Sequence, residues 1–309
     1  MRNQTVVTEF IFMGFPGSHG LHIFLFILFL LIYLITIVSN FVMTVVICVD
    51  LHLHTRMYFF LCNLSILEAF NSSNIFPKML VDFLSKNKRI SFSACLTQSY
   101  FYFLLISVEF FLLGIMSFDR YVAICNPLRY TAIMHRQLCL QLILFCWVGS
   151  ILCILFPTII ISRFPFCGAN IIDHYFCDSA AIVKLACADT RFVQLLEVIL
   201  ALIVLPTSLL LTTVSYTYII FTVLRISSAD ERQKAFSTCA SHLIMVILVY
   251  GSAMFIEVSP IINPSVEMYK GVSLVSNALP PLLNPFIYTL RNEKVKQAIK
   301  DLKNRNLFS

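Results

Sequence analysis

Two carboxylic acids interrupt long apolar stretches of this sequence. At about 1.5 Å per helical residue, Glu68 lies about 17 Å from the polar end of its stretch, and Glu109 about 20 Å from the end of its own. Their depths therefore match if both stretches cross one apolar layer. Two such groups in a medium of low dielectric constant share a proton or hold a cation between them. Alternatively, each is protonated and bonded to neighbouring Ser or Asn, and the residues leave both interpretations open.

An acid and a base stand side by side at Asp119 and Arg120, directly after a third long apolar stretch. A charge at the edge of an apolar layer costs far less free energy than one at its centre. The two side chains are therefore placed to form an ion pair at such an edge. Alternatively, Arg120 merely extends its guanidinium towards lipid headgroups.

The sequence carries none of the common catalytic motifs. GxSxG, GxGxxG, the phosphate-binding loop and HExxH are all absent. His52, His54 and His174 are isolated histidines, which are more often solvated than bound to a metal. We therefore expect no enzyme.

Composition places the apolar stretches in a membrane. The 309 residues are 59% hydrophobic and 12% charged, whereas a soluble domain is about 25% charged. A net charge of +6 indicates basic cytoplasmic loops rather than nucleic-acid binding. A membrane helix needs about 20 apolar residues, and seven stretches qualify, at about 21–49, 58–84, 94–124, 138–162, 192–224, 235–259 and 271–290. The sequence predicts one all-α domain over residues 1–309, a bundle of seven membrane helices.

Both ends of the chain fit one orientation. Lys and Arg are more frequent on the side of the C-terminus, which favours a cytoplasmic C-terminus and an extracellular N-terminus, and Asn3 starts a glycosylation sequon in the outer tail. We expect no cleaved signal peptide. Residues 291–303 alternate apolar residues with lysines, which predicts an amphipathic helix on the inner leaflet.

Four of the eleven cysteines lie at or beyond the expected outer surface: Cys95, Cys167, Cys177 and Cys187. An oxidising outer compartment favours disulfides among them. Four cysteines allow three connectivities, and one of these ties the long outer loop to the third span through Cys95.

Several motifs, read in chain order, resemble one family. They are LHTRMYFFLCNLS at 53–65, MSFDRYVAICNPLRY at 116–130, HYFCD at 174–178, SY at 215–216, KAFSTCASHL at 234–243 and PPLLNPFIYTLRN at 280–292. Together they resemble the vertebrate olfactory receptors of the tetrapod-type class, a branch of the rhodopsin-like G-protein-coupled receptors. The resemblance covers essentially the whole chain. Three positions depart from its pattern, since Ser39 stands for a usual glycine, Arg56 for proline and Glu68 for the common aspartate.

The resemblance implies an odorant receptor of the plasma membrane that activates a stimulatory olfactory-type heterotrimeric G protein and raises cAMP. It implies that Asp119 and Arg120 pair in the resting state and separate on activation. It places further residues in coupling and activation: Tyr121, Tyr216, Lys234, His242, Asn284, Pro285 and Tyr288.

The resemblance also bears on the cysteines and the buried acids. It implies a disulfide between Cys95 and Cys177, and we expect the remaining Cys167 and Cys187 to form the second. Acids at the positions of Glu68 and Glu109 are common in the family, which favours a sodium ion as the cation. No other cofactor is expected.

A ligand of such a bundle would bind between the outer halves of the helices. Our candidate wall residues are Tyr102, Phe103, Ile106, Ser107, Leu200, Ala201, Val204, Tyr250, Met254, Glu257 and Asn277. This set suits a small, mostly apolar volatile molecule with one hydrogen-bonding group, although each residue could instead pack the bundle. Glu257 needs a partner, which Lys270 or a ligand could supply. An ion-coupled transporter or channel could also use Glu68 and Glu109, but we find no internal repeat of the kind transporters have.

Overall fold

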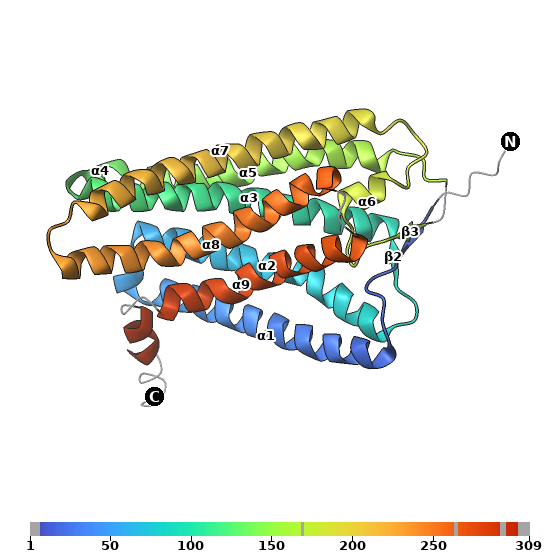
Figure 1. Ribbon diagram of the computed structural model, residues 1–309, viewed down its shortest axis with the longest axis horizontal. Coiled ribbons are helices and arrows are strands. Elements are labelled where there is room, and N and C mark those ends of the chain that lie inside the picture. The colour runs from blue at the N-terminus through green and yellow to red at the C-terminus, as the bar shows by residue number, and fades with distance from the viewer. Residues whose placement is uncertain (1–6, 168–169, 263–264, 291–294, 302–309) are drawn as a thin grey trace.

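The computed structural model describes residues 7–167, 170–262, 265–290 and 295–301. Only the helical backbone is described at 229–231, 234–239, 241–242, 257–262 and 288–290. Seven long helices run side by side (Figure 1): α1 (His19–Val49), α2 (Arg56–Leu84), α3 (Phe92–Cys125), α5 (Arg136–Ser162), α7 (Arg191–Leu224), α8 (Ala229–Ile262) and α9 (Val266–Leu290). Each predicted span lies within one of them, and the prediction of a seven-helix, all-α bundle is confirmed.

Shorter elements lie at the two ends of the bundle. One end, which the sequence analysis assigns to the outside, carries β1 (Glu9–Phe12), β2 (Arg89–Ser91), β3 (Ile171–Ile172) and α6 (Ser179–Val183). The opposite, inner end carries η1 (Leu51–Leu53), η2 (Pro127–Arg129), α4 (Tyr130–Ile133) and a helical segment at 295–301. That segment buries Val295 and Ala298, within the predicted amphipathic helix.

The helices differ in how much of their apolar surface the bundle covers. In the described residues, α1, α3, α5 and α7 are long and apolar enough to cross a membrane. The most apolar stretch of α3 is 72% buried, against 11% in α1 and 17% in both α5 and α7. Helix α3 is therefore the central helix, and the other three turn apolar side chains outward, as a lipid environment requires.

Polar side chains join the helices to one another. Asn40 on α1 donates a hydrogen bond of 2.9 Å to the carbonyl of Pro281 on α9. Gln98 on α3 donates to the carbonyl of Asn74 on α2 at 2.8 Å, and Asn74 donates back to the carbonyl of Gln98 at 3.0 Å. Side-chain bonds of this kind hold helices together in lipid, where apolar contacts alone give little preference for a neighbouring helix.

A three-stranded sheet closes the outer end, and the sequence analysis did not predict it. Its order is β2-β1-β3, with β1 antiparallel to β2 and parallel to β3. The strands are too short to show an alternating pattern, and their pairing joins segments far apart in sequence. Next to the sheet, disulfides join Cys95 to Cys177 and Cys167 to Cys187, the two pairs expected above.

The residues after β3 form a buried aromatic cap over the bundle. The ring of His174 stacks on Tyr175 at 4.6 Å and meets Phe176 edge-on at 4.5 Å, measured between ring centroids. Lys270 on α9 is 2% exposed, pairs with the Asp173 carboxylate and donates to the carbonyl of Gly14 at 2.9 Å. The Lys270 ammonium thus ties α9 to both the outer loop and the N-terminal segment.

Two groups in the cap respond to pH with opposite sign. Burial, and secondarily the Lys270 ammonium, lowers the pKa of His174 from 6.5 to about 3. The unfolded chain therefore binds this proton more tightly, and the stability of the cap falls as pH falls from about 6.5 towards 3. Burial raises the pKa of Asp178 to about 6, against hydrogen bonding from the Ala181 and Ala180 amides and the charge of Lys184. A carboxyl whose pKa is raised gains stability as pH falls through about 6.

We predict that acid destabilises the cap mainly through His174. Between pH 7 and about pH 5, His174 lowers the stability by up to about 2 kcal/mol, at about 1.4 kcal/mol per pKa unit. A His174→Phe variant, which keeps an aromatic ring, should lose less thermal stability in acid than the unmodified protein. An Asp178→Asn variant, which keeps the helix cap but removes the opposing carboxyl, should lose more. The measurement is the melting temperature of the purified protein at both pH values; equal acid sensitivity of the Phe variant and the unmodified protein contradicts the prediction.

Candidate functional site

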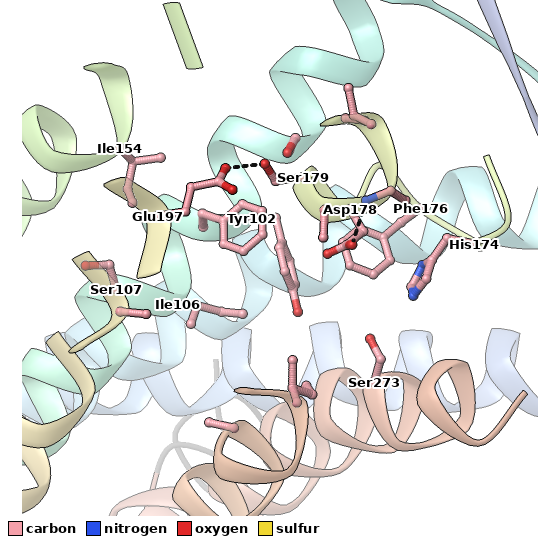
Figure 2. A pocket seen from close by; sticks show the side chains of 18 of the residues that line it. Tyr102, Ile106, Ser107, Ile154, His174, Phe176, Asp178, Ser179, Glu197 and Ser273 are labelled. Atoms are coloured by element: carbon pink, nitrogen blue, oxygen red, sulfur yellow. Dashed lines mark hydrogen bonds between the residues drawn. The ribbon is translucent and has the colours of Figure 1, made fainter. Parts of the chain in front are cut away.

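A cavity of about 900 Å³ opens between the outer halves of the helices. Its walls come from α3, α5, α7, α8, α9 and the outer loop with α6 (Figure 2). This volume is at the upper end of the range of pockets that hold small organic ligands. Eight of the predicted wall residues line it: Tyr102, Phe103, Ile106, Ser107, Leu200, Ala201, Val204 and Asn277.

Two of the three predicted α8 wall residues, Tyr250 and Met254, are not among the residues that line the cavity. Met254 is 48% exposed, and Tyr250 packs against Phe110 at 5.3 Å between ring centroids. Among the α8 side chains that the structure describes, those of Val249, Ala253 and Ile256 line the cavity. One residue turns a helix by about 100°, so a small error of phase exchanges the cavity face for the core. The side chain of Glu257 lies outside the described residues, and Lys270, suggested above as its partner, is engaged by Asp173.

Hydrogen bonds fix several polar groups on the cavity wall. Asn277 donates to the hydroxyl of Tyr175 at 3.0 Å, and that hydroxyl lies 3.1 Å from the Ser273 hydroxyl. Ser150 on α5 donates to Ser107 on α3 at 3.0 Å. Part of the polarity expected of Asn277 is thus used within the protein to hold the cap on α9.

One polar pair on the cavity wall was not predicted from the sequence. Glu197 on α7 accepts a hydrogen bond from the hydroxyl of Ser179 on α6, and the two face the cavity beside Tyr102 (Figure 2). The sequence does contain an indication of this pair, because Glu197 is a carboxylate in the outer half of an apolar helix.

Of the two acids set in the apolar stretches, Glu109 lines this cavity and Glu68 lies near it on α2. Glu68 is 1% and Glu109 8% exposed, and they interact electrostatically across α2 and α3. Asn284 on α9 donates its amide to one oxygen of Glu68. Glu68 Oε2, Asn71 Oδ1 and Asn284 Oδ1 are buried without a hydrogen-bond partner.

These oxygens suit a small cation. Buried acceptors without donors cost free energy, and oxygen atoms are the ligands that hard cations prefer. Among the described residues, no three or more His, Cys, Asp or Glu side chains lie close enough together to hold a metal ion. A cation here would therefore be held by two carboxylates with neutral amide oxygens, a donor set of low charge.

The inner end of α3 carries the predicted ion pair. Arg120 Nη2 pairs with Asp119 Oδ2, and Arg120 Nε lies 3.1 Å from the same oxygen. Tyr130 on α4 donates to Asp119 Oδ1 at 2.8 Å. The Asp119 carboxylate is 1% exposed and joins α3, its own arginine and the inner loop.

The other predicted coupling residues surround this pair in part. Tyr216 on α7 is buried and interacts electrostatically with Arg120, while Tyr121 packs near Tyr218 at 5.7 Å between ring centroids. Pro285 lies inside α9, one residue after Asn284. The side chains of Lys234, His242 and Tyr288, and all of Asn3, lie outside the described residues.

Two departures from the family pattern have local partners. Arg56, in place of proline, donates from Nε to the carbonyl of Met134 at 3.0 Å and so ties the start of α2 to the inner loop. Ser39, in place of glycine, donates to the carbonyl of Thr36 within α1 at 3.2 Å.

Comparisons with known proteins agree with this architecture. A family model described as olfactory receptor matches residues 29–305. Olfactory receptor 6J1 of Homo sapiens is 48% identical over 98% of this chain and 87% of its own length. Olfactory receptor 6E1 of Mus musculus is 46% identical over 97% of this chain and 96% of its own.

A solved structure shares the fold. Squid rhodopsin superposes with a TM-score of 0.72 at 18% identity, covering 94% of this chain and 82% of that one. No comparison supports the transporter alternative, and the matched family consists of receptors rather than enzymes. The chain therefore belongs to the olfactory receptor family, and it is an odorant-sensing G-protein-coupled receptor with a bundle of membrane helices.

Proposed function

We propose that this receptor binds a small, mostly apolar volatile molecule in the cavity and activates a stimulatory olfactory-type heterotrimeric G protein, which raises cAMP. The observation that carries the proposal is the layout of α3. Its outer half supplies Tyr102, Ile106 and Ser107 to the cavity, and its inner end carries the Asp119–Arg120 pair. One central helix thus touches both the ligand and the coupling site.

The same layout supports a location in the plasma membrane with the N-terminus outside. The disulfides, which need an oxidising compartment, lie at the end of the bundle that carries β1. The helical segment at 295–301 and the Asp119–Arg120 pair lie at the other end, which faces the cytoplasm in this proposal.

Activation, in this proposal, breaks the contacts of Asp119. The carboxylate holds both Arg120 and Tyr130, so its loss frees the guanidinium and the inner loop together. A few kcal/mol of differential ligand affinity is enough to shift such a two-state equilibrium. Leu128, 97% exposed on the loop that Tyr130 follows, would be carried with it as an apolar contact for the G protein.

We also propose that Glu68 and Glu109 hold a sodium ion that favours the inactive bundle, with Asn71 and Asn284 as further oxygen ligands. The support is the set of buried oxygens without donors at this site. A cation that binds only the closed state shifts the equilibrium towards it.

We predict that Arg120→Ala abolishes agonist-induced cAMP and leaves surface expression largely intact, because the residue freed for the G protein is missing. Asp119→Asn should instead raise basal cAMP, since it releases Arg120 without ligand. Arg163→Ala, which removes a charge at the outer end of α5, is the matched control and should signal normally. A surface-expressed Arg120→Ala receptor with normal agonist response would refute the proposed coupling role.

We predict that sodium lowers basal activity and agonist potency, and that Glu68→Gln or Glu109→Gln removes this sensitivity. The double variant should show no further loss of sodium sensitivity, because either single substitution already removes the one sodium site. The measurement is agonist dose-response in membranes at constant ionic strength, with sodium exchanged for a bulky organic cation. Protonated acids in a hydrogen-bond network would instead give sensitivity to pH and none to sodium. Potency and basal activity that do not change with sodium in the unmodified receptor rule the ion out.

A further inference from the structure

The pair Glu197–Ser179 occupies the outer part of the cavity and is held from two sides. Ser179 begins α6, a helix capped by Asp178, whose carboxylate accepts from the Ala181 amide at 3.2 Å. Cys177, just before it, is bonded to Cys95 of α3. Ser179 is 5% exposed and donates its hydroxyl to Glu197 Oε1. The Glu197 carboxylate therefore has a fixed position relative to α3.

The wall carries more carboxyl groups than ammonium groups. Among the described residues that line the cavity, the carboxyl groups are Glu109, Asp173, Asp178 and Glu197, and the ammonium group is Lys184. Three of the carboxyl groups have roles within the protein, since Asp173 pairs with Lys270, Asp178 caps α6 and Glu109 lies beside Glu68. The fourth, Glu197, accepts a hydrogen bond from Ser179 and lies in the cavity wall beside Tyr102 (Figure 2).

A carboxylate in this place favours ligand groups that donate a hydrogen bond over groups that can only accept one. Ionised, it only accepts, and it has room for about four donors. A hydroxyl or ammonium group on a ligand can donate to it, and the charge makes that bond roughly twice as strong as a neutral one. An ether or carbonyl oxygen would face it lone pair to lone pair, and a ligand carboxylate would be repelled.

We infer that Glu197, positioned by Ser179, is a specificity-determining residue that selects ligands carrying a hydrogen-bond donor, as an alcohol or a protonated amine does. Carbonyl, ether and carboxylate analogues of the same carbon skeleton bind more weakly. This inference rests on the proposed odorant function of the cavity and names the ligand class that the cavity takes.

The test compares matched ligands on matched variants. For each of several carbon skeletons, the alcohol, primary amine, aldehyde, methyl ether and carboxylic acid are applied to surface-expressed receptor, and half-maximal concentrations for cAMP are measured. We expect the alcohol or the amine to be at least about tenfold more potent than the ether, because hydrogen bonds to charged groups are among the stronger ones. Glu197→Gln should remove this preference for the donor over the ether. The loss of potency should be larger for the amine, which is charged, than for the alcohol.

Two further variants separate a specific role from a structural one. Glu197→Lys should reverse the preference, so that the carboxylic acid becomes the better ligand. Gln194→Leu changes another lining polar residue one turn earlier on α7 and should leave the ratio of alcohol to ether unchanged. Two outcomes would overturn the inference: the Glu197→Gln receptor keeps the preference for ligands with a donor, or the unmodified receptor shows no such preference. Neither outcome would contradict the proposed odorant function. Failure of every volatile in a broad library to raise cAMP through surface receptor would overturn the proposed function, and this inference with it.

Discussion

The buried polar contacts of α2 with α9, and of α1 with α9, are the constraint on which the bundle depends. Lipid tails are as apolar as leucine side chains, so apolar surface alone gives a helix no reason to leave lipid for a neighbour. Glu68 meets Asn284, and Asn40 meets the carbonyl of Pro281, next to a proline-rich part of α9. Pro285 lacks the N–H that would bond the carbonyl four residues earlier, that of Pro281, and Asn40 of α1 donates to this carbonyl instead.

Helix α3 shows how the same constraint permits motion. It bonds to α2 through Gln98 and to α5 through Ser107 in its outer half, and to the inner loop through Asp119. Between these points Ser117 donates to the hydroxyl of Thr212 on α7 at 3.4 Å, and most other buried side chains of α3 are apolar. Few side-chain hydrogen bonds therefore oppose a displacement of this helix. The cavity and the Asp119–Arg120 pair are thus joined by one continuous helix with few polar attachments to its neighbours.

The sequence predicted what depends on length, composition and local order. Seven helices, the position of Asp119 beside Arg120 and eight cavity residues follow from apolar stretches and their depth. The face of α8 that lines the cavity could not be predicted in this way. A helix with lipid on one side and an apolar cavity on the other lacks the polar and apolar faces from which its rotation can be predicted. Met254 and Val249 are equally apolar, and only the packing of Tyr250 against Phe110 decides which faces the ligand.

Contacts between distant segments were also beyond the sequence. Nothing near Arg56 points to Met134, whose carbonyl it meets across the inner end. Nothing near Glu197 points to Ser179, because α6 is placed by the Cys95–Cys177 bridge and by the cap of Asp178.

The central place of β1 in the outer sheet sets an order on biosynthesis. This strand leaves the ribosome first, yet its antiparallel partner β2 follows two helices later and its parallel partner β3 only after α5. In the proposed orientation the N-terminal segment crosses the membrane, and its amide groups stay bound to water until more than half of the chain is made. The end of the bundle that carries the sheet, lumenal in this orientation, therefore stays open to glycosylation and oxidation enzymes until the fourth long helix is inserted.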